Sequence, residues 1–270
     1  MQSISEVSDA PISTHFEWGR AWRALRNLIA DPERTDQVFE IVRALSGNSF
    51  ERSYQRFAAT PEGQQLLRER PNLLKVLSDR EALFAMPEGS FGHTYAEFMQ
   101  TGQLDAEGLV EAERVAEENF ARQIPINPDR DFFGDRLRDT HDLWHVLTGY
   151  GRDQAGEAAN LAFTLAQSWN PGIALIVLAG VVIGPKDLTF SWARYLFSAW
   201  RRGRRATLMT AAPYERLLPL PLEEVRRQLG IQPANEAHPG GILVGNRGEE
   251  PTLVGGTPNN GWQFTNHDAA

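Results

Sequence analysis

The stretch that organises this chain runs from Asp139 to Gly151, with the sequence DTHDLWHVLTGYG, and Glu157 follows it six residues later. His141 and His145 stand four residues apart within this stretch. Positions four apart in an α-helix lie about one turn apart on the same face, because each residue advances by about 100°. On a helix, the two histidines therefore direct both imidazoles at one point.

Two carboxylates lie within reach of the same point. Asp142 is about 60° around the helix from His145. Gly149 and Gly151 predict that this helix ends, so we expect Glu157 to enter from a second helix that turns back. Two imidazoles with one or two carboxylates are typical of a site for zinc or another divalent first-row metal ion.

A histidine pair at this spacing also occurs in helices that bind no metal, as satisfied core or surface residues. Three apolar neighbours, Leu137, Trp144 and Leu147, favour a functional interpretation, because they surround the polar cluster with apolar surface. Burying several titratable groups without a compensating ion is costly. The HExxH pattern of metalloproteases is not met, since Asp142 stands where that pattern has its glutamate, the general base.

Composition limits the possible classes of protein. The chain has 270 residues, 41% of them hydrophobic, with seven tryptophans, which is enough for one large domain with a sizeable core. It has no cysteine, which excludes disulfides, thiolate zinc sites and cysteine nucleophiles and fits a reducing compartment. A net charge of −8 argues against a nucleic-acid partner, whose phosphates require a basic surface.

Membrane insertion is not predicted. The first thirty residues contain neither a basic start nor an apolar run, so no secretory signal is expected. The longest apolar stretch, GIALIVLAGVVIG at 172–184, has thirteen residues, whereas a spanning helix needs about twenty. We therefore predict a fully buried helix there.

Apolar residues recur at helical spacing along most of the chain, and strand signals are nearly absent. The predicted fold is all-α: a single multi-helix domain over residues 15–232, between a loose N-terminal stub (1–14) and a flexible tail (233–270) rich in Gly, Asn and Pro. The predicted helices cover 18–45 with a break at Asp31-Pro32, 50–57, 61–70, 71–77, a helix fed by the turn at 86–95, an acidic helix at 104–120, 132–147, 154–169, 188–200 and 220–229.

An aromatic and then basic segment allows two interpretations. Five aromatic residues between 188 and 200 are followed at once by four arginines: Phe190, Trp192, Tyr195, Phe197 and Trp200, then Arg201, Arg202, Arg204 and Arg205. The aromatic residues fit a core helix, whose dipole the arginines would complement at its C-terminal end. The same order also fits a surface helix that contacts anionic lipid.

The motif resembles a known family. His141-Asp142-x-x-His145, then eleven residues, then Glu157 is similar to the pattern of the coenzyme Q (ubiquinone) biosynthesis protein 4 family. The resemblance covers about residues 20–231 and leaves out both termini. Further blocks that look like family features are Asp31-Pro32, Gly63, Arg70-Pro71, Pro87-x-Gly89-x-Phe91-Gly92-x-x-Tyr95, Trp200-x-x-Gly203 and the helix at 222–226.

The resemblance implies an all-helical protein that binds a divalent metal, zinc first and iron or another first-row metal second. Its ligands would be His141, Asp142, His145 and Glu157. It also implies an enzyme of ubiquinone biosynthesis, a lyase that removes the C1 carboxyl group of a polyprenylated hydroxybenzoate, by an oxidative route. Other enzymes of the pathway and a second copy in a homodimer would be its partners.

The resemblance further implies a place at the inner face of a respiratory membrane. Because no mitochondrial transit segment is apparent, we expect a bacterial member. We therefore expect a cytoplasmic protein, peripheral on the inner face of the inner membrane, that contacts the membrane surface without spanning it. The segments at 172–184 and 188–200 are candidate walls for a polyprenyl channel.

Two other hypotheses stay open at this stage. One is a non-catalytic, lipid-binding scaffold that organises the biosynthetic complex, with a structural metal. The other is an HD-type phosphohydrolase, which would use His93, His141-Asp142 and a later aspartate, Asp153 or Asp187. In that case His145 and Glu157 would have no role.

Overall fold

The computed structural model describes residues 15–31, 34–101, 127–183, 189–237, 242–244 and 252–254. Within these ranges the domain body is helical, which confirms the all-α prediction. The helices are α1 (Trp18–Ala30), α2 (Thr35–Ala44), α3 (Ser49–Ala58), α4 (Pro61–Glu69), α5 (Leu73–Ser78), α6 (Arg80–Phe84), α7 (Phe91–Thr101), α9 (Pro128–Asp139), α10 (His141–Thr148), α11 (Gln154–Gln167), α12 (Pro171–Ile183), α13 (Thr189–Arg205), the 3-10 turn η2 (Met209–Ala211), α14 (Tyr214–Leu217), α15 (Leu222–Leu229) and α16 (Ala234–Ala237).

Three short elements lie beyond residue 233, where the sequence predicts a tail. Helix α16 begins at Ala234, which is fully buried. Strands β1 (Ile242–Val244) and β2 (Thr252–Val254) pair antiparallel, with Leu243 opposite Leu253. The predicted acidic helix at 104–120 lies outside the described residues.

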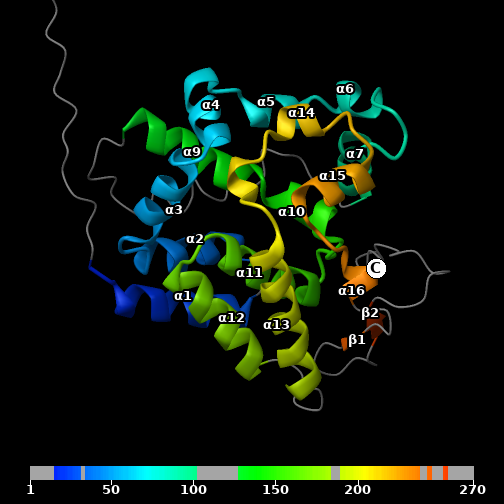
Figure 1. Ribbon diagram of the computed structural model, residues 1–270. Helices are drawn as coiled ribbons and strands as arrows, with labels where there is room; N and C mark the ends of the chain where they lie inside the picture. The colour runs from blue at the N-terminus through cyan, green and yellow to red at the C-terminus, as the bar shows by residue number, and fades with distance from the viewer. Residues whose placement is uncertain are drawn as a thin grey trace, which may run out of the picture.

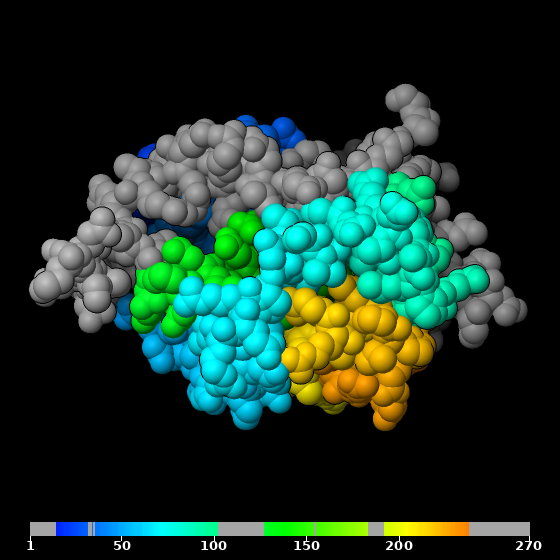
Figure 2. Space-filling model, turned by 90° about the horizontal axis from the view of Figure 1, so that it is seen from above, coloured from blue at the N-terminus to red at the C-terminus, as the bar shows by residue number. Residues whose placement is uncertain are grey.

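The helices form two groups, seen in Figure 1 as a lower group of α1, α2, α11, α12 and α13 and an upper group of α3 to α7, α9, α14 and α15. Helix α10 lies between the two groups and packs against α7, α9, α11 and α15. Figure 2 views the molecule from the side of the upper group, where α4, α9, the α5–α7 segment and the α14–α15 segment close over the interior.

Helix α10 is the most deeply buried segment of the domain. Every residue of it except His141 is buried. Its indole anchor is fixed by a hydrogen-bond chain, in which Trp144 Nε1 donates to the Tyr214 hydroxyl (2.9 Å) and that hydroxyl donates to the Met209 carbonyl (3.0 Å). The core around α10 therefore includes polar groups that are satisfied in pairs.

Two arginines from distant helices satisfy the last carbonyls of α10. Arg226 in α15 donates to the carbonyls of Leu147 and Val146, both at 2.9 Å. Arg202 in α13 donates to the carbonyl of Thr148 at 2.9 Å and also to that of Gln232. These carbonyls have no partner within their own helix, so the guanidinium groups both complete their hydrogen bonds and complement the helix dipole.

The arginines that follow the aromatic segment therefore divide into two sets. Arg202 is buried and bonds to α10, whereas Arg201, Arg204 and Arg205 are exposed. Among the aromatics, Trp192 and Tyr195 are buried and Phe197 is exposed. One side of α13 thus faces the core and the other faces solvent, and contact of the exposed side with lipid stays a prediction.

The structure corrects the prediction of a fully buried helix at 172–184. Helix α12 packs on α2, α11 and α13. On its other side, Leu178 is 60% and Val182 73% exposed. The helix lies at the edge of the lower group, so its neighbours cover only part of an apolar circumference (Figure 1).

A second correction concerns the predicted helix at 132–147, which is two helices. Helix α9 ends at Asp139 and α10 begins at His141. Between them, the Thr140 hydroxyl donates to the Leu137 carbonyl at 3.3 Å, a local bond that competes with regular helix geometry. The break places His141 in the first turn of a separate helix.

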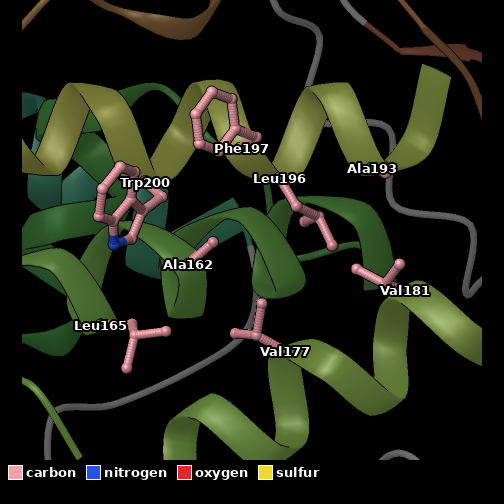
Figure 3. Close-up of a pocket in the computed structure, with 8 residues that line it drawn as sticks. All are labelled: Ala162, Leu165, Val177, Val181, Ala193, Leu196, Phe197 and Trp200. Carbon is pink, nitrogen blue, oxygen red and sulfur yellow. The ribbon is translucent and has the colours of Figure 1, made fainter. Parts of the chain in front are cut away.

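An apolar groove runs between α11, α12 and α13, with a cavity volume of about 300 Å³ (Figure 3). Its lining is entirely apolar and comes from all three helices: Ala162, Leu165, Val177, Val181, Ala193, Leu196, Phe197 and Trp200. Phe197 and Trp200 stack with their ring centroids 5.6 Å apart. The two segments predicted to wall a lipid channel thus line one groove together.

Close packing of α11 against α13 depends on Gly203. A Cβ added there would lie 2.5 Å from the Phe163 carbonyl oxygen and 2.9 Å from the Ala166 Cβ. Such distances leave no room for a side chain, because one contact is a backbone atom that cannot rotate away.

We expect Gly203→Ala to lower the free energy of unfolding by about 1–3 kcal/mol, because it overpacks this contact. Gly180→Ala is the matched control in α12, where an added Cβ meets no atom within 4 Å. The control should raise the free energy of unfolding by up to about 1 kcal/mol through helix propensity alone. Urea unfolding of both variants measures the difference, and equal stabilities would contradict the close α11–α13 contact.

Candidate metal centre

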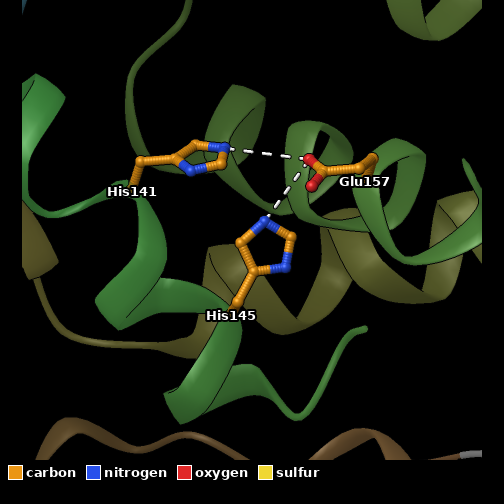
Figure 4. A group of neighbouring side chains, drawn as sticks. All are labelled: His141, His145 and Glu157. Carbon is orange, nitrogen blue, oxygen red and sulfur yellow. Dashed lines mark ion pairs between the residues drawn. The ribbon is translucent and has the colours of Figure 1, made fainter. Parts of the chain in front are cut away.

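Three predicted ligands meet at one point between two helices. His141 and His145 come from α10 and Glu157 comes from the first turn of α11. One potential ligand atom from each lies within 4.8 Å of the other two. In Figure 4 the two imidazoles and the carboxylate point toward one another, as the spacing of the sequence motif predicts.

His145 is held in one orientation at the bottom of the site. Its side chain is fully buried, and its Nδ1 lies 3.1 Å from the Tyr150 carbonyl oxygen. Because a carbonyl only accepts, Nδ1 carries a proton, and Nε2 is the ring nitrogen that faces Glu157, whose Oε2 is 3.4 Å away. Among the described residues this buried Nε2 has no hydrogen-bond partner. An orphaned buried ring nitrogen of this kind fits a metal ligand.

His141 stands at the open side of the site. Its side chain is 32% exposed, its Nε2 lies 3.8 Å from Glu157 Oε2, and its Nδ1 lies 3.2 Å from Asp142 Oδ1. Burial alone would lower the pKa of His141, but the Asp142 hydrogen bond and the charges of Asp142 and Glu157 outweigh it and raise this pKa to about 9. A metal ion at Nε2 would have to displace that proton.

Both carboxylates of the site are ionised. Burial acts to raise the pKa of Asp142, but its hydrogen bond to His141 and the nearby histidine charges lower it overall. Burial likewise acts to raise the pKa of Glu157, and its interactions with His145 and His141 lower it below its ordinary value. The Glu157 side chain is 39% exposed, so the cluster opens toward solvent beside Glu157 and His141.

The loop between the helices follows from its sequence. Gly149 ends α10 in the left-handed region (φ 72°), and its N–H donates to the His145 carbonyl at 2.8 Å. Asp153 then caps α11 by accepting from the N–H groups of Ala155 (3.0 Å) and Gly156 (3.1 Å). The capped helix begins immediately, which brings Glu157 back toward α10.

Helix α7 supplies one wall of the site. The Phe98 ring stacks on the His145 ring at a centroid distance of 5.9 Å and an interplanar angle of 24°. The guanidinium carbon of Arg152 lies 3.7 Å from the Phe98 centroid. Neither contact was predicted from the sequence. The position of Arg152 between His145 and Glu157 in sequence is the one signal that could have indicated it.

Asp142, the fourth predicted ligand, lies outside the group of three and beside His141. A carboxylate that accepts from a ligand histidine fixes the ring tautomer and raises its basicity. Its role as a direct ligand stays a prediction.

The residues of the phosphohydrolase hypothesis are not brought together. The Nδ1 of His93 donates to the Met86 carbonyl (3.2 Å), and His93 is not part of the cluster. Asp153 is the N-terminal cap of α11. Asp187 lies outside the described residues. This arrangement does not support that hypothesis.

Two imidazoles and a carboxylate, open on one side, fit a divalent zinc or iron ion with a free coordination position. The fold and the site thus define a class: an all-helical protein with a candidate metal centre carried on two adjacent helices. A family model described as "Coenzyme Q (ubiquinone) biosynthesis protein Coq4" matches residues 11–235. The chain belongs to this family, which acts in ubiquinone biosynthesis.

Known proteins of the family are similar over most of their length. The rat mitochondrial ubiquinone biosynthesis protein COQ4 homolog is 29% identical over 220 residues, 80% of this chain and 76% of the rat protein. The mitochondrial ubiquinone biosynthesis protein coq4 of Aspergillus terreus is 27% identical over 215 residues, 79% of this chain and 70% of the fungal protein.

A solved structure shares the fold. The crystal structure of a protein from Nostoc punctiforme superposes with a TM-score of 0.58 at 22% identity, covering 80% of this chain and 99% of that one. Separately, none of the helices in the described part of the chain combines the length and apolar character that a bilayer crossing requires.

We expect purified wild-type protein to carry about one divalent ion per chain, and the His141→Ala/His145→Ala double variant to carry none, because it removes both imidazole ligands. Metal analysis by mass spectrometry measures this. His93→Ala, which changes a histidine outside the cluster, is the matched control and should retain the ion. Because His145 is buried, Glu157→Gln provides a milder variant, and thermal unfolding of each preparation reports whether it is folded. A double variant with wild-type metal content would contradict the site.

Proposed function

We propose that this protein is a metal-dependent lyase that removes the C1 carboxyl group of a polyprenylated hydroxybenzoate by an oxidative route. The observation that carries the proposal is the orphaned Nε2 of His145, which faces Glu157 at the bottom of a cluster open to solvent. Membership of a ubiquinone-biosynthesis family supports the substrate class.

The proposed reaction breaks the bond between C1 and the carboxyl carbon and forms a bond from C1 to oxygen. An aromatic acid and water then give a phenol, carbon dioxide, two protons and two electrons. An external oxidant must accept the two electrons, and we propose dioxygen for this role. A divalent ion in the site would supply a Lewis acid for a carboxylate or phenolate oxygen of the substrate.

The residues of this chain position that chemistry. The Tyr150 carbonyl fixes the tautomer of His145, and Asp142 fixes that of His141. Both histidines thereby direct Nε2 toward the position of the ion, whose binding would release the proton of His141. The partly exposed side chains of His141 and Glu157 leave one side of the site accessible for the aromatic head group.

The groove between α11, α12 and α13 is suited to the polyprenyl chain. Helix α11 carries Glu157 in its first turn and contributes Ala162 and Leu165 to the groove. At about 1.5 Å per residue, Leu165 lies about 12 Å along the helix axis from Glu157. One helix therefore connects the metal cluster to an apolar surface, which fits a substrate with a polar head and an apolar tail.

We expect His141→Ala to leave a folded protein whose host cells accumulate the carboxylated precursor, because the variant loses a ligand whose side chain is partly exposed. Lipid extracts of complemented cells, analysed by mass spectrometry, measure precursor and ubiquinone. His93→Ala is the control and should restore ubiquinone like the wild type. Normal ubiquinone with His141→Ala would contradict the enzymatic function.

The His141→Ala variant also distinguishes the scaffold alternative from the enzyme. A scaffold with a structural metal should lose its fold and its assembly with other pathway enzymes together when ligands are removed. An enzyme should keep both and lose only the product. Pull-down of the pathway enzymes with His141→Ala therefore assigns the role of the metal.

We further propose that the protein binds the membrane surface through the exposed side of α13. Arg194, Phe197, Arg201 and Arg204 are exposed and recur at helical spacing along one stripe. Phe197 and Trp200, at the edge of this stripe, also line the apolar groove. Basic side chains beside an apolar opening suit an anionic bilayer that holds the substrate.

We expect the triple variant Arg194→Gln/Arg201→Gln/Arg204→Gln to bind anionic lipid vesicles roughly a hundredfold more weakly, since each arginine near such a surface contributes about 1 kcal/mol. Sedimentation with phosphatidylglycerol vesicles measures the affinity. Arg52→Gln/Arg68→Gln/Arg80→Gln removes the same charge from exposed positions on α3, α4 and α6. If both triple variants weaken binding equally, only net charge matters and the α13 surface is not the binding site.

A further inference from the structure

Among the described residues, Arg152 is the arginine beside the candidate metal site, and it lies in the loop that joins α10 and α11. Its guanidinium carbon stands 3.7 Å from the Phe98 centroid, and its Nη2 lies 3.3 Å from the Met99 sulfur. An aromatic face and a thioether are weak partners for a group with five N–H donors. The described residues therefore offer this guanidinium only weak partners.

The guanidinium of Arg152 has no ion pair with any described carboxylate, and its Nε is buried without a hydrogen-bond partner. A buried Nε without a partner also occurs in Arg136 and Arg202, but at least one Nη atom of each of these two arginines bonds to protein oxygens. Arg136 forms a salt bridge to Glu215 at 2.8 Å and also donates to the Ala212 carbonyl. Arg226 donates to two helix carbonyls. Among the described residues Arg152 has neither a carboxylate nor a carbonyl partner, so a partly buried guanidinium is left suited to an anionic ligand.

The carboxylates near Arg152 do not supply the anionic partner that it lacks. Burial lowers the pKa of Arg152, while Asp142 and Glu157 act to raise it, so both carboxylates are close enough to affect its charge. Those carboxylates already interact with the histidines. Neither is therefore available as a full partner of the guanidinium.

We propose that Arg152 binds the carboxylate of the aromatic substrate and distinguishes the substrate from its decarboxylated product. The inference rests on the proposed function. A guanidinium fork matches the two oxygens of a carboxylate, and the stacked rings of Phe98 and His145 place that fork beside the cluster. Loss of the carboxyl group removes the partner of Arg152, so the product is bound less tightly than the substrate. Arg152 is thus a specificity-determining residue.

The test compares two probes that differ only in the carboxyl group, 3-geranyl-4-hydroxybenzoate and 2-geranylphenol, by calorimetric titration of the purified protein. Wild type should bind the acid about tenfold to a hundredfold more tightly than the phenol, the effect expected of hydrogen bonds to a charged group. Arg152→Gln should lose this preference and bind the phenol within about twofold of wild type. Arg152→Lys, which keeps the charge without the fork, should give an intermediate preference for the acid.

Arg68→Gln, an exposed arginine on α4, is the control and should keep the wild-type preference. An Arg152→Gln variant that still prefers the acid as wild type does would overturn the inference and leave the proposed function standing. Equal weakening of both probes would also overturn it, because that result indicates a structural role. A wild type that binds neither probe would refute the proposed substrate class, and the inference with it.

Discussion

The structure depends on satisfying the polar groups of one short, buried helix. Seven of the eight residues of α10 are buried, so its last carbonyls are far from water. Arg226 from α15 and Arg202 from α13 supply the missing donors. Both helices are therefore tied to α10 by charged hydrogen bonds, and α15 also packs against it. Because α10 carries both histidines, these bonds also fix the position of the candidate metal site relative to the lower and upper groups of helices.

The candidate metal site contains more charged side chains than such a site ordinarily holds without a bound ion. Two carboxylates, two imidazoles and the guanidinium of Arg152 lie around one opening. Without an ion, a proton on His141 offsets part of the negative charge, which explains its raised pKa. A bound cation would take over that role. The two ionisable carboxylates thus favour a positive charge at the centre of the candidate site.

Local patterns predicted much of this arrangement. Helical spacing and the glycines after α10 were sufficient to bring His141, His145 and Glu157 together, because these rules involve only neighbouring residues. Long-range features were not predictable. Arg202 turns inward to reach the last carbonyl of α10, and Leu178 is exposed because α12 lies at an edge. Both features depend on tertiary placement. The contacts of Arg152 were not predictable because a single arginine in a loop has no periodicity that indicates its partners.

The loop from Gly149 to Asp153 has several tasks within five positions. The Tyr150 carbonyl orients His145, the Arg152 side chain lies against Phe98, and Asp153 starts α11. An inserted or deleted residue would shift all of these at once, together with the angle at which Glu157 returns. The fold therefore constrains the spacing of eleven residues between His145 and Glu157. We expect relatives that keep His141, His145 and Glu157 but have a different spacing to have a different conformation throughout the loop between α10 and α11.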